Sequence, residues 1–354
     1  MTARAADAVP RVHPPAPPRG TGAVGYVLPL RWDDDSGLAE LTAYLHRIGE
    51  CAEVAEVVVV DGSPPALFRA HARAWGGAVR HLRPDERTRC GNGKVSGVLT
   101  GVRHATAERL IIADDDVRYD GPALRAVASL LDRADLVRPQ NFFEPAPWHA
   151  LWDTARTLIN RSVGRDYPGT FGIRRSTFLA MGGYDGGVLF ENLELIRTVR
   201  AHGGTEARPL DVYVRRLPPG TGRFWAQRLR QAYDDTAQPA RMALFLSVLP
   251  AVAAAVRGRR FGLLLAGAAL PVALAEVGRR RAGGSAVFPA ASVLLAPIWV
   301  LERGVCVWPA LVARLRGTGV AYAGAHLRLA AHSTRHLRAR ARRTAASASP
   351  AARG

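Results

Sequence analysis

The chain has 354 residues, enough for one large domain with an appendage, and its 48 lysines and arginines against 30 aspartates and glutamates give a formal net charge of +18. Nucleic acid would suit this charge, but no nucleic-acid-binding signature accompanies it, and the arginines cluster beside apolar stretches, which favours a membrane partner. Cys51, Cys90 and Cys306 are widely separated, show no disulfide or zinc pattern and fit a reducing compartment.

The first part of the chain predicts an unstructured leader followed by an α/β domain. Residues 1–23 are rich in proline, alanine and arginine and lack an apolar core, so we expect a disordered leader, not a signal peptide. Strands are then predicted at 24–30, 54–60, 78–82, 110–113 and 136–139, and helices at 38–48, 66–75, 94–105 and 124–131. Near-continuous valine and isoleucine runs between helices indicate a parallel sheet buried on both faces.

Carboxylates follow two of the predicted strands. Asp61 ends a run of four valines, and Asp114, Asp115 and Asp116 follow a run of isoleucine and alanine. Ligands of parallel sheets bind at the carboxyl ends of the strands, and two aspartates two residues apart can offer oxygens to Mg²⁺ or Mn²⁺. A solvated acidic turn is the alternative for this aspartate run, whose outer pair, Asp114 and Asp116, carries the metal prediction.

Residues 141–235 change character and are interpreted as a substrate-facing extension of the same domain. Trp148 and Trp152, four residues apart, suit either stacking on a sugar ring or packing in a core. An amphipathic helix is predicted from about Leu189 to Ala201.

Three apolar stretches follow, at residues 242–256, 261–277 and 286–300. Each is shorter than the ~20 residues that a membrane span prefers. Four prolines interrupt them, and arginines flank the middle stretch at both ends. Tilted or broken transmembrane helices, interfacial helices with a re-entrant hairpin, and a buried helical pair are the alternatives; we favour membrane attachment.

Five motifs occur in this order: Val58-Val59-Val60-Asp61-Gly62-Ser63; Gly91-Asn92-Gly93-Lys94; Asp114-Asp115-Asp116; Gly182-Gly183-Tyr184-Asp185 followed by Glu191-Asn192-Leu193-Glu194-Leu195; and Gln227-Arg228-Leu229-Arg230-Gln231. Together they resemble the motifs of membrane-attached family 2 inverting glycosyltransferases, over about residues 24–235. The third is similar to the family's DxD metal motif and the last to its Q-x-x-R-W stretch. The resemblance implies an α/β fold of the GT-A type, a Rossmann-like nucleotide-diphospho-sugar transferase domain with a mostly parallel sheet, followed by apolar membrane helices.

The resemblance also implies roles for individual residues. It implies that the donor is bound by Asp61, Lys94, Asp114, Gln227 and Arg230. It also implies that a Mg²⁺ or Mn²⁺ ion is bound by Asp114 and Asp116.

The resemblance does not assign the catalytic base directly, because Asn192 stands where the family has its catalytic aspartate and an amide cannot act as a base. We therefore expect Glu191, where the loop enters the helix, to take the proton, with Glu194 as the second candidate; a helix-capping role is the alternative for Glu191. Two further departures are the first-strand end at Pro29-Leu30-Arg31 and Gln231 in place of the family's tryptophan, which argues against processive polymer synthesis.

The expected protein is a metal-dependent inverting glycosyltransferase. It would move a sugar from a nucleotide-diphosphate donor to a lipid-linked or cell-envelope acceptor, with the catalytic domain on the cytoplasmic face of the cell membrane. The expected organisation is a leader (1–23), a GT-A domain (24–235), a membrane-associated helical region (236–318) and a basic tail (319–354). A catalytically degenerate membrane scaffold of the same fold and a sugar-phosphate or nucleotidyl transferase are the alternatives.

Overall fold

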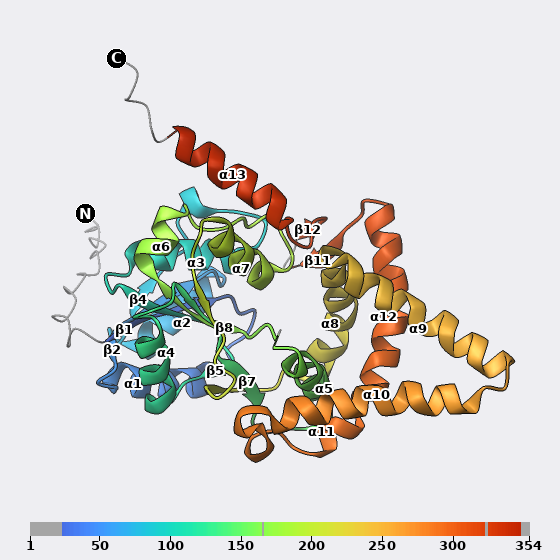
Figure 1. The fold of residues 1–354 in the computed structure, drawn as a ribbon. Coiled ribbons are helices and arrows are strands. Elements are labelled where there is room, and N and C mark those ends of the chain that lie inside the picture. The colour runs from blue at the N-terminus through green and yellow to red at the C-terminus, as the bar shows by residue number, and fades with distance from the viewer. Residues whose placement is uncertain (1–22, 165, 323–324, 348–354) are drawn as a thin grey trace, which may run out of the picture.

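A central sheet organises the first two thirds of the chain (Figure 1). The computed structural model describes residues 23–164, 166–322 and 325–347, so most of the predicted leader lies outside the described residues. Within these ranges the sheet has the order β3-β2-β1-β4-β8-β6-β9, in which β8 runs antiparallel to β4 and β6. Its strands are β1 (Val24–Leu30), β2 (Val54–Asp61), β3 (Arg80–Leu82), β4 (Arg109–Ala113), β6 (Leu136–Val137), β8 (Thr170–Arg174) and β9 (Glu206–Ala207).

Helices cover both faces of this sheet, as the valine and isoleucine runs predict. Side chains alternate along a strand, so Tyr26 and Leu28 of β1 join one core and Val27 joins the other. The first core includes residues of α1 (Leu38–Glu50), α2 (Pro65–Trp75) and α4 (Gly121–Leu130), and the second includes residues of α3 (Gly93–His104), α6 (Arg175–Ala180) and α7 (Glu191–Ala201). The predicted α/β fold with a mostly parallel sheet is confirmed.

A small second sheet brings two distant segments to the end of β4. It consists of β5 (Val117–Arg118), β10 (Tyr213–Arg216) and β7 (Gln140–Phe143), in the order β5-β10-β7. The antiparallel pairing of β10 with β5 sets Arg216 opposite Val117. This register places Arg216 beside the aspartate run that lies between β4 and β5.

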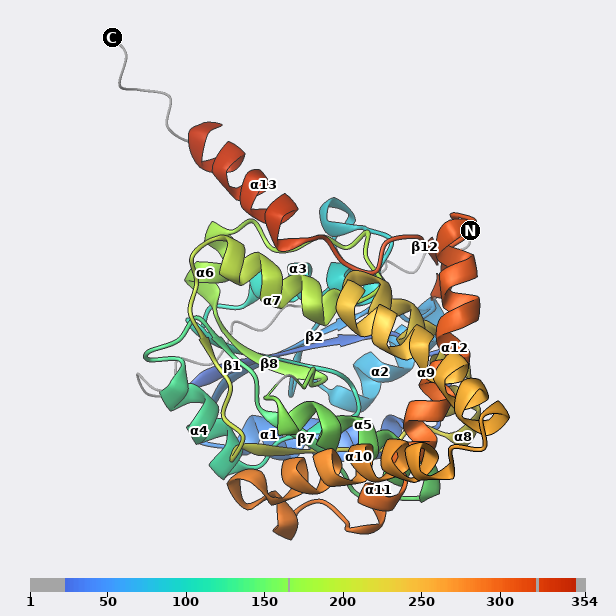
Figure 2. The ribbon, with the colours of Figure 1, turned by 45° about the vertical axis from the view of Figure 1, so that its right-hand side comes forward.

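Three helices are long and apolar enough to cross a membrane, namely α9 (Pro239–Arg257), α10 (Phe261–Arg280) and α12 (Ala296–Leu315). α10 packs along α5 (Trp148–Ser162), and α12 packs along α8 (Thr221–Tyr233), α9 and α5 (Figure 2). The approach of α10 is very close, because a Cβ added at Gly278 would lie 1.9 Å from the carbonyl oxygen of Leu158.

The long helix α12 does not coincide with the apolar stretch predicted at 286–300. A 3-10 helix (Arg281–Ala286) ends where that stretch begins, the short α11 (Ala291–Leu294) follows, and α12 begins only at Ala296. Pro297 lies in the first turn of α12, where the missing N–H costs no helical hydrogen bond. Pro250 and Pro271, by contrast, lie inside α9 and α10 without ending either helix.

The outer faces of these helices expose a large apolar surface. Leu263 and Leu265 on α10 are 58% and 73% exposed, and the same holds for much of α12, including Val305 and Leu315. In a buried helical pair these side chains would pack against the rest of the protein, whereas in a membrane-attached protein they would contact lipid. The three helices therefore indicate membrane association.

The C-terminal segment returns to the α/β domain. A hairpin of β11 (Val320–Tyr322) and β12 (Ala325–Leu327) leads to residues 328–333 and then α13 (Thr334–Ser347). The amides of Leu189 and Phe190 donate to the carbonyls of Leu329 and Ala330 at 2.9 and 2.8 Å. The segment thereby holds the loop that enters α7.

Candidate active site

A cavity of about 1020 Å³ lies between the carboxyl ends of β1 and β4 on one side and the helices α5, α8, α9 and α12 on the other. Most of its polar side chains are charged. The acidic ones are Asp33, Asp34, Asp114, Asp115, Asp116, Asp153, Glu191, Asp234 and Asp235, and the basic ones are Arg31, Lys94, Arg156, Arg216, Arg223, Arg230, Arg241 and Arg303.

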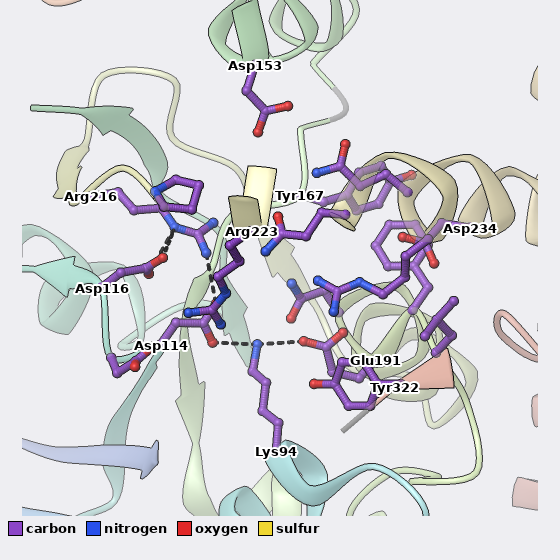
Figure 3. A pocket seen from close by; sticks show the side chains of 18 of the residues that line it. Lys94, Asp114, Asp116, Asp153, Tyr167, Glu191, Arg216, Arg223, Asp234 and Tyr322 are labelled. Carbon is purple, nitrogen blue, oxygen red and sulfur yellow. Dashed lines mark hydrogen bonds and ion pairs between the residues drawn. The ribbon is translucent and has the colours of Figure 1, made fainter. Parts of the chain in front are cut away.

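Lys94 bridges two carboxylates at one wall of this cavity (Figure 3). It sits in the first turn of α3, whose first amides donate to the side chain of Asn92. The Lys94 ammonium lies 2.6 Å from Asp114 Oδ1 and 2.5 Å from Glu191 Oε1. Burial alone would lower the pKa of Lys94, but Asp114 and Glu191 raise it well above its usual value, so the group stays cationic.

Arg216 of β10 joins the aspartate run. Its Nε donates to both carboxylate oxygens of Asp116 at 2.9 Å, and its Nη2 lies 3.4 Å from Asp114 Oδ2. Burial raises the pKa of Asp116 to about 6, with Arg216 opposing the rise and Asp114 adding to it. Burial would also raise the pKa of Asp114, but Lys94 and Arg216 lower it.

The carboxylates of Asp114 and Asp116 fit a divalent cation that completes its shell from a substrate. Burial is the main cause of the raised pKa of Asp116, and the negative charges of Asp114 and Asp115 add to it, so a divalent cation would stabilise the ionised pair. Among the described residues no group of three or more acidic, histidine or cysteine side chains could hold a metal alone. Mg²⁺ typically takes one or two carboxylates and completes its shell with phosphate oxygens and water, so a two-aspartate site suits a nucleotide diphosphate.

Two other predicted aspartates have partners of their own. Asp115 accepts a hydrogen bond of 2.5 Å from the indole of Trp32, a contact that nothing in the sequence predicts. Asp61 is fully buried, does not line the cavity, and accepts from His71 at 2.7 Å and His81 at 3.0 Å. Burial would raise the pKa of Asp61, but the hydrogen bonds from His81, Ser63 and His71 hold it well below its usual range.

The two glutamates of α7 occupy different surroundings. Glu191, at the first position of the helix, lines the cavity, as does Asn192, whose amide donates to the Pro168 carbonyl at 3.1 Å. Glu194 is fully buried, does not line the cavity, and accepts from the backbone N–H of His332 at 2.8 Å while its other oxygen lies 2.9 Å from His332 Nδ1. Only Glu191 of this pair can meet a substrate in the cavity.

Helix α8 contributes a polar stripe to the cavity. Gln227 and Arg230, both predicted, line it together with Arg223, which is one turn before Gln227, and Arg230 lies over the ring of Tyr322 at 5.1 Å. Figure 3 shows Arg223 reaching towards Asp114. Trp148 and Trp152 do not line the cavity and instead pack with Phe224 and Trp225 of α8.

The sequence does not predict several of the cavity residues, among them Arg216, Trp32 and Tyr322. Arg216 arrives through the β5–β10 pairing, Trp32 through the loop after β1, and Tyr322 through the returning C-terminal hairpin. None lies in a motif that identifies it. A basic residue at the end of a strand is the one weak signal for Arg216.

The sheet order, the aspartates at the end of β4 and the carboxylate at the start of α7 agree with the GT-A fold that the family resemblance implies. No protein-family model matches the chain, and no curated protein matches it in sequence. Among solved structures, a mannosyltransferase from Pyrobaculum calidifontis, determined in complex with GDP-Man and Mn²⁺, aligns with 84% of this chain and 89% of its own length. The TM-score is 0.54 at 19% sequence identity.

Two other solved structures align with a smaller share of this chain than the mannosyltransferase does. A glucosyl-3-phosphoglycerate synthase from Mycobacterium tuberculosis with bound Mn²⁺ and UDP covers 59% of this chain and 77% of its own, with a TM-score of 0.36 at 13% identity. GalNAc-T7 with UDP, GalNAc and Mn²⁺ covers 56% and 44%, with a TM-score of 0.39 at 18% identity. These scores are too low to add to the argument, whereas the alignment with the mannosyltransferase shows a shared fold.

Proposed function

We propose that this protein is a metal-dependent, inverting glycosyltransferase that uses a nucleotide-diphosphate sugar and modifies a lipid-linked or cell-envelope acceptor. One observation carries the proposal. The aspartate pair Asp114 and Asp116, which suits a divalent cation, and the cavity-facing Glu191 lie on either side of Lys94 in a single cavity. Leaving-group stabilisation and proton removal are the two tasks of such a transfer, and the two kinds of carboxylate suit them.

Asp114 and Asp116 would hold the divalent cation, which when bound stabilises the charge that develops on the departing diphosphate. Lys94 and Arg216 add positive charge at the same place, since both contact Asp114. Arg223, which has no carboxylate within 4 Å among the described residues, is free to contact a phosphate oxygen. Asp61 would contribute to donor binding indirectly: it accepts a hydrogen bond from the Ser63 amide and so fixes the conformation of the loop after β2.

Glu191 would take the proton from the acceptor hydroxyl as that oxygen attacks the anomeric carbon. Lys94 orients the carboxylate by its contact with Oε1, which leaves Oε2 for the acceptor. Attack from the side opposite the diphosphate inverts the anomeric centre, so an α-linked donor would give a β-glycoside. Glu194 would position α7 through its bonds to His332 rather than meet the substrate.

A membrane location for the acceptor is supported by the exposed apolar faces of α9, α10 and α12. Arg257 ends α9, and Arg259 and Arg260 lie between α9 and α10, where the lipid phosphates of a cytoplasmic leaflet would attract them. Helices that lie in the surface of this leaflet without crossing it would keep the catalytic domain on the cytoplasmic side.

The test is sugar transfer by the purified full-length protein. A panel of nucleotide sugars is incubated with Mn²⁺ and a membrane lipid extract, and released nucleoside diphosphate and product anomer are measured. We expect turnover of at least one donor, loss of at least a hundredfold in Asp114→Asn, and unchanged turnover in Asp132→Asn, an exposed aspartate distant in the fold. Donor binding without any turnover would instead favour the degenerate scaffold, and a retained anomeric configuration would refute inversion.

A further inference from the structure

A second basic cluster lies in the same cavity, away from the aspartate pair. Its guanidinium groups come from three helices that the apolar region brings together: Arg156 from α5, Arg241 from α9 and Arg303 from α12. Arg303 is 1% exposed although it lies on an apolar helix. An arginine in such a position is costly unless it is paired or has a function.

The carboxylates present neutralise this cluster incompletely. Asp235 is shared by Arg241, at 2.8 Å, and Arg303, at 3.4 Å. Asp153 lies 3.6 Å from Arg156 and is also a partner of the buried Arg228 of α8 at 3.2 Å. Glu302 is the second partner of Arg228 at 3.4 Å, so four arginines share three paired carboxylates. Among the described residues Arg156 donates no hydrogen bond, so both of its Nη groups stay available to a ligand.

The neighbouring Asp234 forms no ion pair with the described arginines of this cluster. Its Oδ1 is buried and has no hydrogen-bond partner in the described part of the chain. Burial raises the pKa of Asp234 well above its usual value, against the opposing effect of Arg230. Burial thus favours the neutral carboxyl group, which can donate a hydrogen bond to an anion.

The cluster extends along the cavity. Arg156 is close enough to Arg216 for their charges to interact, whereas Arg241 and Arg303 share Asp235, the residue after Asp234. In Figure 3, Asp114 and Asp116 lie on one side of Glu191, and Asp234 lies on the other. An anion bound there would approach Glu191 from the side away from the donor diphosphate, where an acceptor must lie.

We propose that Arg156, Arg241 and Arg303 form a binding site for a phosphate group carried by the acceptor. This inference rests on the proposed function, since it assigns the cluster to the acceptor of that reaction. Planar guanidinium groups bind phosphate oxygens through paired hydrogen bonds, and three of them converge here from different helices. The phosphate belongs either to a lipid headgroup, which the adjoining apolar faces of α9 and α12 would admit, or to a water-soluble molecule.

The experiment measures anion binding by calorimetry on the full-length protein in detergent. Mn²⁺ and saturating UDP or GDP, whichever binds, are present so that the donor end is already filled. Inorganic phosphate is one probe and dihexanoyl phosphatidic acid the other. Tighter binding of the lipid points to a lipid headgroup, and equal binding of both points to a soluble phosphate acceptor.

The variants separate the cluster from the rest of the protein. We expect Arg156→Gln to weaken binding of the tighter probe roughly ten- to hundredfold and Arg156→Lys to weaken it less, because lysine keeps the charge but not the paired donors. Arg125→Gln, at an exposed arginine paired with Glu53, is the matched control and should leave Kd unchanged. Arg156 carries a side chain that is 20% exposed, so its replacement tests binding with less risk to folding than replacement of Arg303.

Two results would overturn the inference: neither probe binds the nucleotide-filled protein, or Arg156→Gln binds both as tightly as the unchanged protein. Failure of the proposed function looks different, because UDP and GDP would then both fail to bind with Mn²⁺. In that case the probes are titrated without nucleotide, and the same comparison of Arg156→Gln with Arg125→Gln decides whether the cluster binds phosphate.

Discussion

Glu191 and Glu194 are three residues apart on one helix, and replacing each by glutamine should have opposite consequences. Glu191→Gln keeps the size of the side chain and a contact with Lys94, whose second anionic partner, Asp114, remains at 2.6 Å. Folding should therefore change little. Loss of a general base typically costs 10²–10⁴-fold in rate, or about 3–5 kcal/mol of barrier, and we expect kcat to fall in that range.

Glu194→Gln should act on stability. The carboxylate is fully buried, and its two contacts with His332 hold the C-terminal segment against the loop before α7. Hydrogen bonds to a buried charge are worth about 1.5–3 kcal/mol each, and the amide keeps part of this, so we expect a loss of about 2–4 kcal/mol in unfolding free energy. Catalysis measured well below the melting temperature should fall less than tenfold.

The assay compares both variants for kcat, for donor Kd and for thermal unfolding under the same detergent and Mn²⁺. The predicted pattern is a loss of kcat with normal donor Kd and melting for Glu191→Gln, and lowered melting with largely retained kcat for Glu194→Gln. The assignment of the base is refuted if Glu191→Gln turns over within threefold of the unchanged protein. It is equally refuted if Glu194→Gln loses kcat a hundredfold without a change in melting.

Three further predictions concern stability and the membrane. Asp61→Asn replaces one of the two buried oxygens that accept from His71, His81 and the Ser63 amide by an NH₂ group that cannot accept. It should cost about 2–3 kcal/mol, seen in chemical denaturation, whereas a change below 0.5 kcal/mol would mean that the carboxylate is not structurally important. Gly278→Leu should detach α10 from α5, because a Cβ there would overlap the Leu158 carbonyl, and protease should then cut the α9–α10 region faster; an unchanged cleavage rate would contradict this packing. Leu265→Lys, on the exposed face of α10, should reduce co-sedimentation with vesicles, and undiminished sedimentation would exclude this face from the lipid contact.

The sequence predicts the parts of the site that depend on local patterns. Strand ends are visible as β-branched runs followed by aspartates, so Asp114 could be placed at one edge of a sheet, and the family resemblance assigned Lys94 and Glu191 to the same site. The structure brings these three side chains within hydrogen-bond distance of one another through Lys94.

Residues brought in by long-range pairing could not be predicted in this way. Arg216 depends on the register of β10 against β5, and Tyr322 depends on the return of the chain after α12. Residues 302 and 303 lie just beyond the apolar stretch predicted at 286–300, and only the packing of α12 on α8 shows that Arg303 faces the cavity. The contact of His332 with Glu194 could not be predicted either, because the two residues are far apart in the sequence.

The central claim is that Asp114 and Asp116 bind a nucleotide-sugar diphosphate through a divalent cation. Calorimetric titration of UDP and GDP into the full-length protein, with Mn²⁺ and with EDTA, tests it most directly when repeated on the Asp114→Asn, Asp116→Asn double variant. The account predicts binding of at least one nucleotide that requires Mn²⁺ and weakens at least a hundredfold in the double variant. Equal binding with EDTA, or by the double variant, would contradict it.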